Sequence, residues 1–249
     1  MSINRKASIA GIFEYTFFVG PTHQESIVPF VTKVNVDASK DLVPVAAIVR
    51  FQNYLLVKAD SPFNSIGEFV AYACQHPKRL TYGSSGTATG PHMAGEMLMQ
   101  RTGIELIHVP YKGAAPALQA ALSGEVDAIF DPGVGFGHVS SGRLKMISVA
   151  SGQRSALFPA VPTTVEAGLA DVRMDMLTGI WAPRKTPADV IQRMANAIEK
   201  VTATSDFQSK MGSMGAQALY MNPVSFSKFI DDETRVLSRL IKERNITVD

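Results

Sequence analysis

One short turn concentrates the residue types that could bind a small anion. The segment Gly83–Gly90 reads GSSGTATG. Its glycines, Gly86 among them, permit positive φ and a close approach of a ligand to the backbone, and its hydroxyl groups can donate hydrogen bonds. These hydroxyl groups belong to Ser84, Ser85, Thr87 and Thr89. The turn is therefore the first place to look for a binding site.

The position of this turn strengthens the hypothesis of an anion site. It is expected to join the carboxyl end of a strand to the N-terminus of a helix, where unpaired N–H groups and the helix dipole favour negative charge. Ordinary strand-to-helix turns are also rich in Gly, Ser and Thr. The spacing alone leaves both interpretations open.

Two further side chains could contact a ligand. Asp131 follows a predicted strand at its carboxyl end, where open α/β sheets bind ligands, although it could equally cap the following turn. His92 lies at the mouth of the glycine turn and is the most plausible histidine contact, whereas His108 is expected to be a structural strand residue. The histidines lack metal-ligand spacing, so no metal site is predicted.

Catalytic interpretations of the same turn are weaker. It lacks the Gly-Lys-Ser/Thr ending of a nucleotide P-loop, and its G-S-S-G order departs from the G-x-S-x-G of a nucleophile elbow. Serine hydrolysis would need an oriented histidine late in the chain, and the last histidine is His138. We predict that the chain is not an enzyme, with a hydrolase acting through Ser84 or Ser85 as the alternative.

The elements around the turn predict an α/β fold. Short apolar runs alternate with helical patterns that end at single glycines, which is typical of a parallel sheet covered by helices. The expected strands are Phe13–Gly20, Val43–Ile48, Tyr54–Lys58, Leu80–Tyr82, Glu105–Val109, Val126–Phe130, Leu144–Ala150 and Gly179–Ala182. Amphipathic helices are predicted after Ser65, from Gly90 as N-cap, over Ala114–Ser123, and after Pro187 and Pro223. The simplest arrangement is one α/β unit inserted between two halves of another.

Composition excludes several classes of partner. Lys plus Arg (24) nearly balances Asp plus Glu (22), which gives no electrostatic reason to expect nucleic acid or a membrane surface. No apolar run reaches the roughly 20 residues of a membrane span, and no signal peptide is recognisable at the start of this chain. Cys74 is expected to be a buried apolar residue.

Several linked segments resemble one known family. They read YGSSGTATGPHMAGE, IHVPYKGAAPALQAALSGEVDAIFD, LFPAVPTTVEAGL, EYTFFVG and VNVDASKDLVPVA. Their order and spacing, from about Glu14 to the C-terminus, resemble the Bug-type substrate-binding proteins of tripartite tricarboxylate transporters. Two departures are an alanine at position 88, where the family usually has a further glycine, and the run LTGIWAPRKTP, where Arg184 and Lys185 replace small residues.

The resemblance implies a type II periplasmic-binding-protein fold, with two α/β lobes around a cleft that closes on a small carboxylic acid. Lobe 2 would be residues 58–176, and lobe 1 would be residues 1–57 together with 177–249. The implied partners are a di- or tricarboxylate ligand and the permease subunits of a membrane transporter, without nucleic acid or cofactor. The implied location is the periplasm.

The resemblance also implies which residues bind the ligand. In the family, carboxylates are held mainly by backbone N–H groups, hydroxyls and water in loops. The matching positions in this chain are Ser84, Ser85, Gly86, Thr87, Thr89, His92 and Asp131 in lobe 2, and Thr22 and His23 in lobe 1.

Family members begin with a signal peptide and a strand–helix–strand segment that carries a Pro-Gly-Gly ligand loop. This sequence starts roughly 60–70 residues later than that pattern, so we expect an incomplete first lobe with exposed sheet edges. A truncated remnant that no longer binds ligand is a further alternative, and it predicts that cooperative melting is absent.

Overall fold

The computed structural model describes residues 16–33 and 37–248. The chain divides into two compact units, one made of Met1–Arg50 and Leu177–Asp249 and the other of Phe51–Met176. The first boundary was expected after Val57, but the strand Tyr54–Lys58 pairs with two strands of the second unit and belongs to it. The expected strand Phe13–Gly20 begins at Phe18, and its first residues, 13–15, lie outside the described part.

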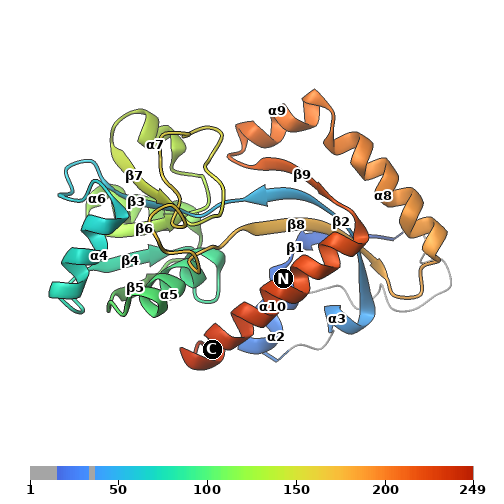
Figure 1. Cartoon of the computed structure of the whole chain (residues 1–249), viewed down its shortest axis with the longest axis horizontal. Coiled ribbons are helices and arrows are strands. Elements are labelled where there is room, and N and C mark those ends of the chain that lie inside the picture. Colours follow the sequence, from blue (N-terminus) through green and yellow to red (C-terminus); the bar gives the residue numbers. More distant parts are fainter. Residues whose placement is uncertain (1–15, 34–36, 249) are drawn as a thin grey trace. The chain divides into compact units, whose positions relative to one another are not determined.

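The first unit contains a four-stranded sheet with the order β1-β8-β2-β9 (Figure 1). Its strands are β1 (Phe18–Pro21), β2 (Leu42–Phe51), β8 (Met176–Pro183) and β9 (Gln217–Met221). β1 and β9 each pair antiparallel with their neighbour, β8 and β2 respectively. Among the described strands β1 lies at one end of this sheet, and its Val19 is 57% exposed, so the expectation of a buried strand there is wrong.

Two long amphipathic helices supply the cores of the first unit, α8 (Ala188–Thr202) and α10 (Pro223–Glu243). Successive residues of β8 belong to two different core clusters. Ala182 is in the cluster that contains Ile198 of α8, and Trp181 is in the cluster that contains Phe226 of α10. This alternation is the period-two geometry of a strand buried on both faces. α9 (Ser205–Ser213) and β9, which lie between the two helices in the sequence, were not predicted.

Three short helices complete the described part of the first unit. They are α1 (His23–Ser26), α2 (Val28–Val31) and α3 (Ala38–Asp41). In the part of the chain that the structure describes, no helix is both long enough and apolar enough to span a membrane.

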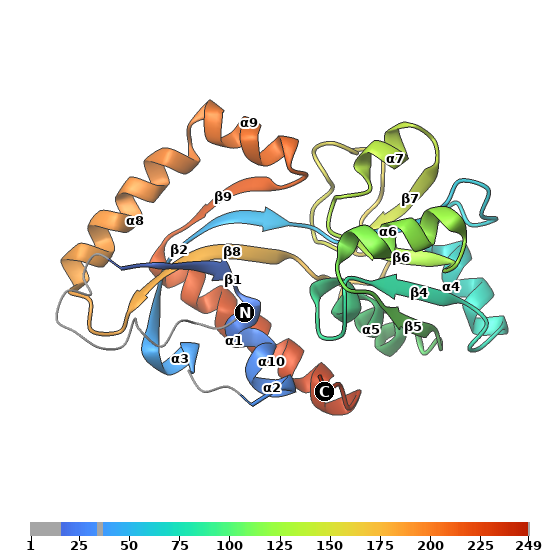
Figure 2. The same ribbon diagram turned by 180° about the vertical axis from the view of Figure 1, so that it is seen from behind.

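The second unit is built on a five-stranded sheet with the order β5-β4-β6-β3-β7. Its strands are β3 (Tyr54–Lys58), β4 (Thr81–Ser84), β5 (Ile107–Pro110), β6 (Ala128–Asp131) and β7 (Leu144–Val149). Figure 2 labels β4, β5, β6 and β7, and Figure 1 labels β3. β4 is parallel to β5 and β6, as predicted, whereas β3 inserts antiparallel between β6 and β7. The alternation of strands and helices along the sequence does not determine which strands are neighbours in the sheet. It therefore could not predict that β3 lies between β6 and β7.

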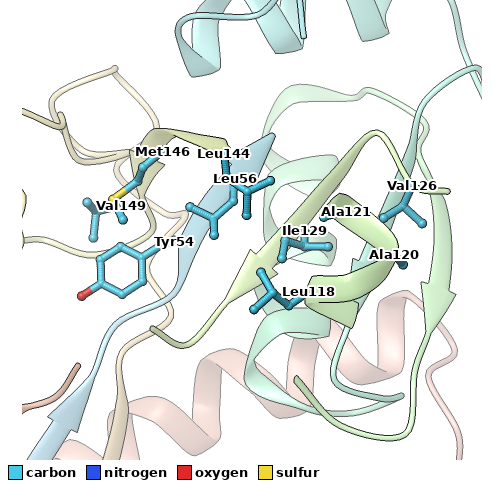
Figure 3. Packing of buried hydrophobic residues seen from close by; sticks show 10 residues of the cluster. All are labelled: Tyr54, Leu56, Leu118, Ala120, Ala121, Val126, Ile129, Leu144, Met146 and Val149. Atoms are coloured by element: carbon cyan, nitrogen blue, oxygen red, sulfur yellow. The ribbon is translucent and has the colours of Figure 1, made fainter. Parts of the chain in front are cut away.

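Four helices accompany this sheet: α4 (Ile66–Gln75), α5 (Gly90–Thr102), α6 (Ala114–Ser123) and α7 (Phe136–Ser140). The core between α6 and the sheet consists of ten buried residues, and Leu118 of α6 lies close to Ile129 of β6 (Figure 3). α4 begins at Ser65, whose Oγ accepts the Glu68 amide at 3.2 Å. Its buried stripe is Ile66, Phe69 and Ala73, so Cys74 falls on the other face and is exposed, contrary to expectation.

A candidate anion site at the start of helix α5

The glycine turn connects β4 to α5 within the second unit, as the sequence predicted. Its conformation is sharply bent: Gly86 has φ 134° and Ala88 has φ 60°. The N-cap of α5 is Thr89, one residue before the expected Gly90, and Pro91 stands in the first helical turn. The Thr89 hydroxyl donates back to the Gly86 carbonyl at 2.7 Å and does not cap the helix.

The helix start therefore keeps unpaired donors. Within the described residues, the amides of Thr87, Gly90 and His92 donate to no backbone or side-chain acceptor. Gly90 and His92 are buried, and α5 is 13 residues long. A buried helix N-terminus without a cap is normally completed by water or by a ligand, and the helix dipole favours an anion there.

Gly90 is a place of close backbone packing. A Cβ at this position would lie 2.4 Å from the Met176 Sδ and 3.3 Å from the Asn53 Nδ2. Asn53 is fully buried, its Nδ2 donates to the Met174 carbonyl at 2.7 Å, and its Oδ1 has no partner. This asparagine beside the helix start was not predicted, because a single asparagine between two strands carries no pattern in the sequence.

The Ser84 hydroxyl belongs to the interior of the second unit. Ser84 is fully buried, its Oγ lies 2.7 Å from the His108 Nε2, and it accepts the Gly86 amide at 3.2 Å. Burial and the neighbouring His92 lower the pKa of His108 to about 4, which leaves it neutral at pH 7. The expectation that His108 is structural is confirmed, since its ring also stacks on Tyr82.

The His92 ring is engaged on both of its nitrogens. Nδ1 accepts the Ala88 amide at 2.9 Å, and Nε2 lies 3.4 Å from the Glu96 Oε1. The ring also stacks on His108, with centroids 3.9 Å apart and an interplanar angle of 7°. The Tyr82 hydroxyl reaches the same Glu96 oxygen at 3.3 Å. No ring nitrogen is left for a ligand, so the geometry gives His92 a role inside the protein.

The remaining hydroxyls of the turn are closer to solvent. Ser85 donates to the Thr89 Oγ1 at 3.2 Å, and the Thr87 hydroxyl has no partner among the described residues. Lys112, after β5, is exposed, in line with a solvated surface lysine. The described residues contain no group of histidines, cysteines and carboxylates suited to a metal ion.

Asp131 has the capping role that the sequence offered as one of two interpretations. Its Oδ2 accepts the amides of Gly133 at 2.8 Å and Gly135 at 3.0 Å, so it caps the turn before α7. Its Oδ1 is buried and has no hydrogen-bond partner within the part of the chain that the structure describes. Burial raises the pKa of the Asp131 carboxyl, and the two amide hydrogen bonds oppose that rise.

Thr22 and His23 lie in the first unit, at the start of α1. The Thr22 Oγ1 and the His23 Nε2 are both buried, and neither has a hydrogen-bond partner in the described ranges 16–33 and 37–248. Burial lowers the pKa of His23 to about 4. These two polar atoms resemble the Asp131 Oδ1 in being unsatisfied inside the protein.

Comparison with known sequences gives a consistent picture. The profile described as "Tripartite tricarboxylate transporter family receptor" (TctC) matches residues 12–246. A UPF0065 protein in the gbd 5' region of Cupriavidus necator is 32% identical over 215 residues, covering 86% of this chain and 65% of that protein. Protein BugT of Bordetella pertussis is 26% identical over 206 residues, covering 82% of this chain and 63% of BugT. The chain thus spans slightly less than two thirds of the length of these relatives.

Solved structures agree with this assignment. Rpa4515 of R. palustris, solved with adipate, superposes with a TM-score of 0.80 at 25% identity, covering 94% of this chain and 79% of that one. MatC from Rhodopseudomonas palustris, solved with bound malate, has a TM-score of 0.77 at 25% identity, with coverages of 95% and 82%. The periplasmic binding protein BugD, at 24% identity and a TM-score of 0.76, shares the fold.

The expected periplasmic-binding-protein fold is confirmed by these superpositions. The family is one of substrate-binding receptors, which agrees with the prediction of a binding protein rather than a catalyst. Because the profile covers almost the whole sequence, the chain belongs to the tripartite tricarboxylate transporter receptors, the Bug-type (TctC) solute-binding proteins, and not to an enzyme family.

Proposed function

We propose that this chain is an extracytoplasmic receptor that captures a small di- or tricarboxylic acid, with one carboxylate at the start of α5. The observation that carries the proposal is that the amides of the buried residues Gly90 and His92, at a helix N-terminus without a side-chain cap, have no acceptor among the residues that the structure describes. A carboxylate would supply the missing acceptors and would interact favourably with the helix dipole.

Relatives support the class of ligand. The similar structures of Rpa4515 and MatC hold adipate and malate, which are both dicarboxylates. The net charge of this chain is only +2, so the attraction of an anion must come from local groups rather than from the overall field. The unpaired amides at the helix start are such local groups.

Burial and hydrogen bonding support a division of the proposed contacts into two groups. Ser85, Gly86, Thr87 and Thr89 are the proposed contacts of the turn, because they are only partly buried. Ser84 and His92 contribute chiefly as support, because their side chains are buried and paired inside the protein. Asp131 is proposed as an acceptor through its free Oδ1. Thr22 and His23 are proposed as the candidate ligand contacts of the first unit.

The wider setting is also a proposal. We infer that the two compact units correspond to the two lobes of the family fold, that the chain acts in the periplasm, and that it delivers its ligand to permease subunits of a tripartite transporter. Family membership supports each of these statements.

A ligand panel tests the proposal. Succinate, malate, glutarate, adipate and citrate are each added in a thermal-shift assay, and hits are measured by calorimetry. Adipamide and malamide serve as matched controls that keep the shape and remove the charge. At 100 times Kd an acid should stabilise the protein by about 2.7 kcal/mol, and the amides should have no effect.

The same samples separate the receptor from the hydrolase alternative. A receptor returns its ligand unchanged, so NMR spectra of the acid after long incubation should be identical to those of the starting material. The proposed function would be refuted if the protein hydrolysed an ester and none of the acids shifted its melting temperature. The fully buried Ser84 hydroxyl gives no support to such turnover.

A further inference from the structure

A buried chain of polar groups runs from the sheet of the second unit to the glycine turn. The Tyr82 hydroxyl of β4 and the His92 Nε2 of α5 both approach the Glu96 Oε1, at 3.3 and 3.4 Å. His92 in turn accepts the Ala88 amide of the turn at 2.9 Å. His92 and Glu96 are almost fully buried, so these contacts form in a medium where each is worth more than at the surface.

These contacts fix the protonation form of the ring. The Ala88 N–H is a donor, so the His92 Nδ1 must be an acceptor and carries no hydrogen. A neutral imidazole then has its single hydrogen on Nε2, which is the nitrogen that faces the Glu96 carboxylate. Glu96 therefore selects the tautomer that allows His92 to hold the turn.

The residue that His92 holds has a strained backbone. Ala88 has φ 60°, a left-handed conformation that costs an L-residue with a Cβ about 1–2 kcal/mol. Such a conformation persists only where surrounding contacts over-determine it. The bond from the Ala88 amide to His92 is the one contact of that amide in the described part of the chain.

We propose that His92, oriented by Glu96, is a positioning residue that keeps Ala88 left-handed and so keeps the amides of Thr87, Gly90 and His92 unpaired for the ligand. This inference rests on the proposed function for its effect on binding. Ala88 lies between Thr87 and Gly90 in the sequence, so a change of its φ would move the Thr87 amide relative to the amides of Gly90 and His92. In this proposal the His92 ring positions the turn and does not itself contact the ligand.

The first test needs no ligand. The ¹⁵N chemical shifts of the His92 ring should report hydrogen on Nε2 and a bare Nδ1. The backbone shifts of Ala88 should report a left-handed residue in the wild-type protein and an ordinary one in His92→Phe, which keeps the stacking on His108 and removes both nitrogens. An Nδ1–H tautomer, or an Ala88 that stays left-handed in His92→Phe, would overturn the proposal.

The second test uses three substitutions of the same residue. His92→Asn keeps an acceptor near the position of Nδ1, His92→Gln places its amide nearer the position of Nε2, and His92→Phe keeps neither. Calorimetry with adipate and malate should show near-normal affinity for His92→Asn and a loss of about tenfold, the worth of one hydrogen bond, for the other two. Equal affinities of all three variants and the wild-type protein would contradict the proposal.

A rescue experiment separates positioning from general damage. Glycine adopts left-handed φ without strain, so adding Ala88→Gly to His92→Phe should recover part of the lost affinity. If the double variant binds the acid no more tightly than His92→Phe alone, His92 does not act through the conformation of Ala88. If the wild-type protein binds none of the five acids of the panel, the proposed function fails, and the ring tautomer and the Ala88 shifts still decide whether His92 positions the turn.

Discussion

Ala88 is an alanine in a backbone conformation that suits glycine, with φ 60°. Relief of the left-handed strain should favour Ala88→Gly by about 1–2 kcal/mol, and the larger entropy of an unfolded glycine should offset about 0.4–1 kcal/mol of that. We therefore expect Ala88→Gly to raise the free energy of unfolding by up to about 1.6 kcal/mol, measured by urea denaturation. Ala88→Val should lower it, because a β-branched residue tolerates positive φ worst. A more stable valine variant would contradict the assigned conformation.

His108 gives the second unit a pH-dependent stability. Its pKa is lowered from 6.5 to about 4, first by burial and then by His92, while Glu96 acts in the opposite direction. The unfolded chain therefore binds this proton more readily than the folded one. The stabilising contribution is complete above pH 6.5 and is lost as the pH falls towards 4. The buried His23 of the first unit acts in the same direction.

Urea midpoints at pH 7 and pH 5 test the role of His108. The wild-type protein should lose more stability between these two values than His108→Gln, whose amide can still reach Ser84. His76 is exposed, so His76→Gln is the matched control and should leave the wild-type dependence unchanged. If the wild type and His108→Gln lose the same amount of stability between pH 7 and pH 5, His108 does not take up the proton on unfolding.

At this scale the sequence predicted the location of the candidate site but not its construction. The turn was recognisable because Gly83, Gly86 and Gly90 are spaced through it among hydroxyl residues. The partners of His92 were missed, although Glu96 lies four residues further along the same helix, which is a spacing that brings side chains together. Asn53 could not be predicted, because only the tertiary fold brings it next to Gly90.

At the scale of elements, α5 packs closely on β4 through a glycine. A Cβ on Gly95 would lie 2.3 Å from the Tyr82 Cε2 and 2.5 Å from its Cζ. The Tyr82 ring is itself buried and stacked on His108, so it cannot move aside easily. Gly95→Ala should therefore lower the free energy of unfolding by about 1–3 kcal/mol through overpacking.

Gly212 in α9 is the matched control for this substitution. It is also helical, but a Cβ there would meet no atom within 4 Å. Gly212→Ala should therefore stabilise the protein by about 0.5–1 kcal/mol, through helix propensity alone. Thermal and urea melts should show changes of opposite sign relative to the wild type: the free energy of unfolding should fall in Gly95→Ala and rise in Gly212→Ala. Two alanine variants with the same effect would argue against the close packing of α5 on β4.

Most elements were predictable because their periodicity and end signals agree. Ser65 caps α4, Gly103 and Gly124 end α5 and α6 in left-handed conformations, and Pro223 starts α10. α9 and β9 were missed because α9 buries no residue completely and β9 is only partly buried, so neither carries a clear apolar pattern. The direction of β3 was missed because pairing partners are decided by the whole sheet.

At the scale of the whole molecule, the second unit is one continuous segment with its own core. Residues 51–176 contain the five-stranded sheet and the ten-residue cluster of Figure 3. We expect this segment, expressed alone, to fold and to melt cooperatively, because its buried residues pack on one another. Dichroism and a dispersed ¹H–¹⁵N spectrum would check this. A segment that stays unfolded would show that the core depends on the rest of the chain.

Binding of a carboxylate at the start of α5 can be tested by NMR of the backbone amides of the whole chain. Adipate or malate is titrated into ¹⁵N-labelled protein, with adipamide and malamide as uncharged controls. We expect saturable shifts of the Thr87, Gly90 and His92 amides with an acid and none with its amide, because only the acid supplies an anionic acceptor for unpaired N–H groups. Binding of an acid that leaves these three amides unmoved and shifts residues elsewhere would contradict binding at the start of α5.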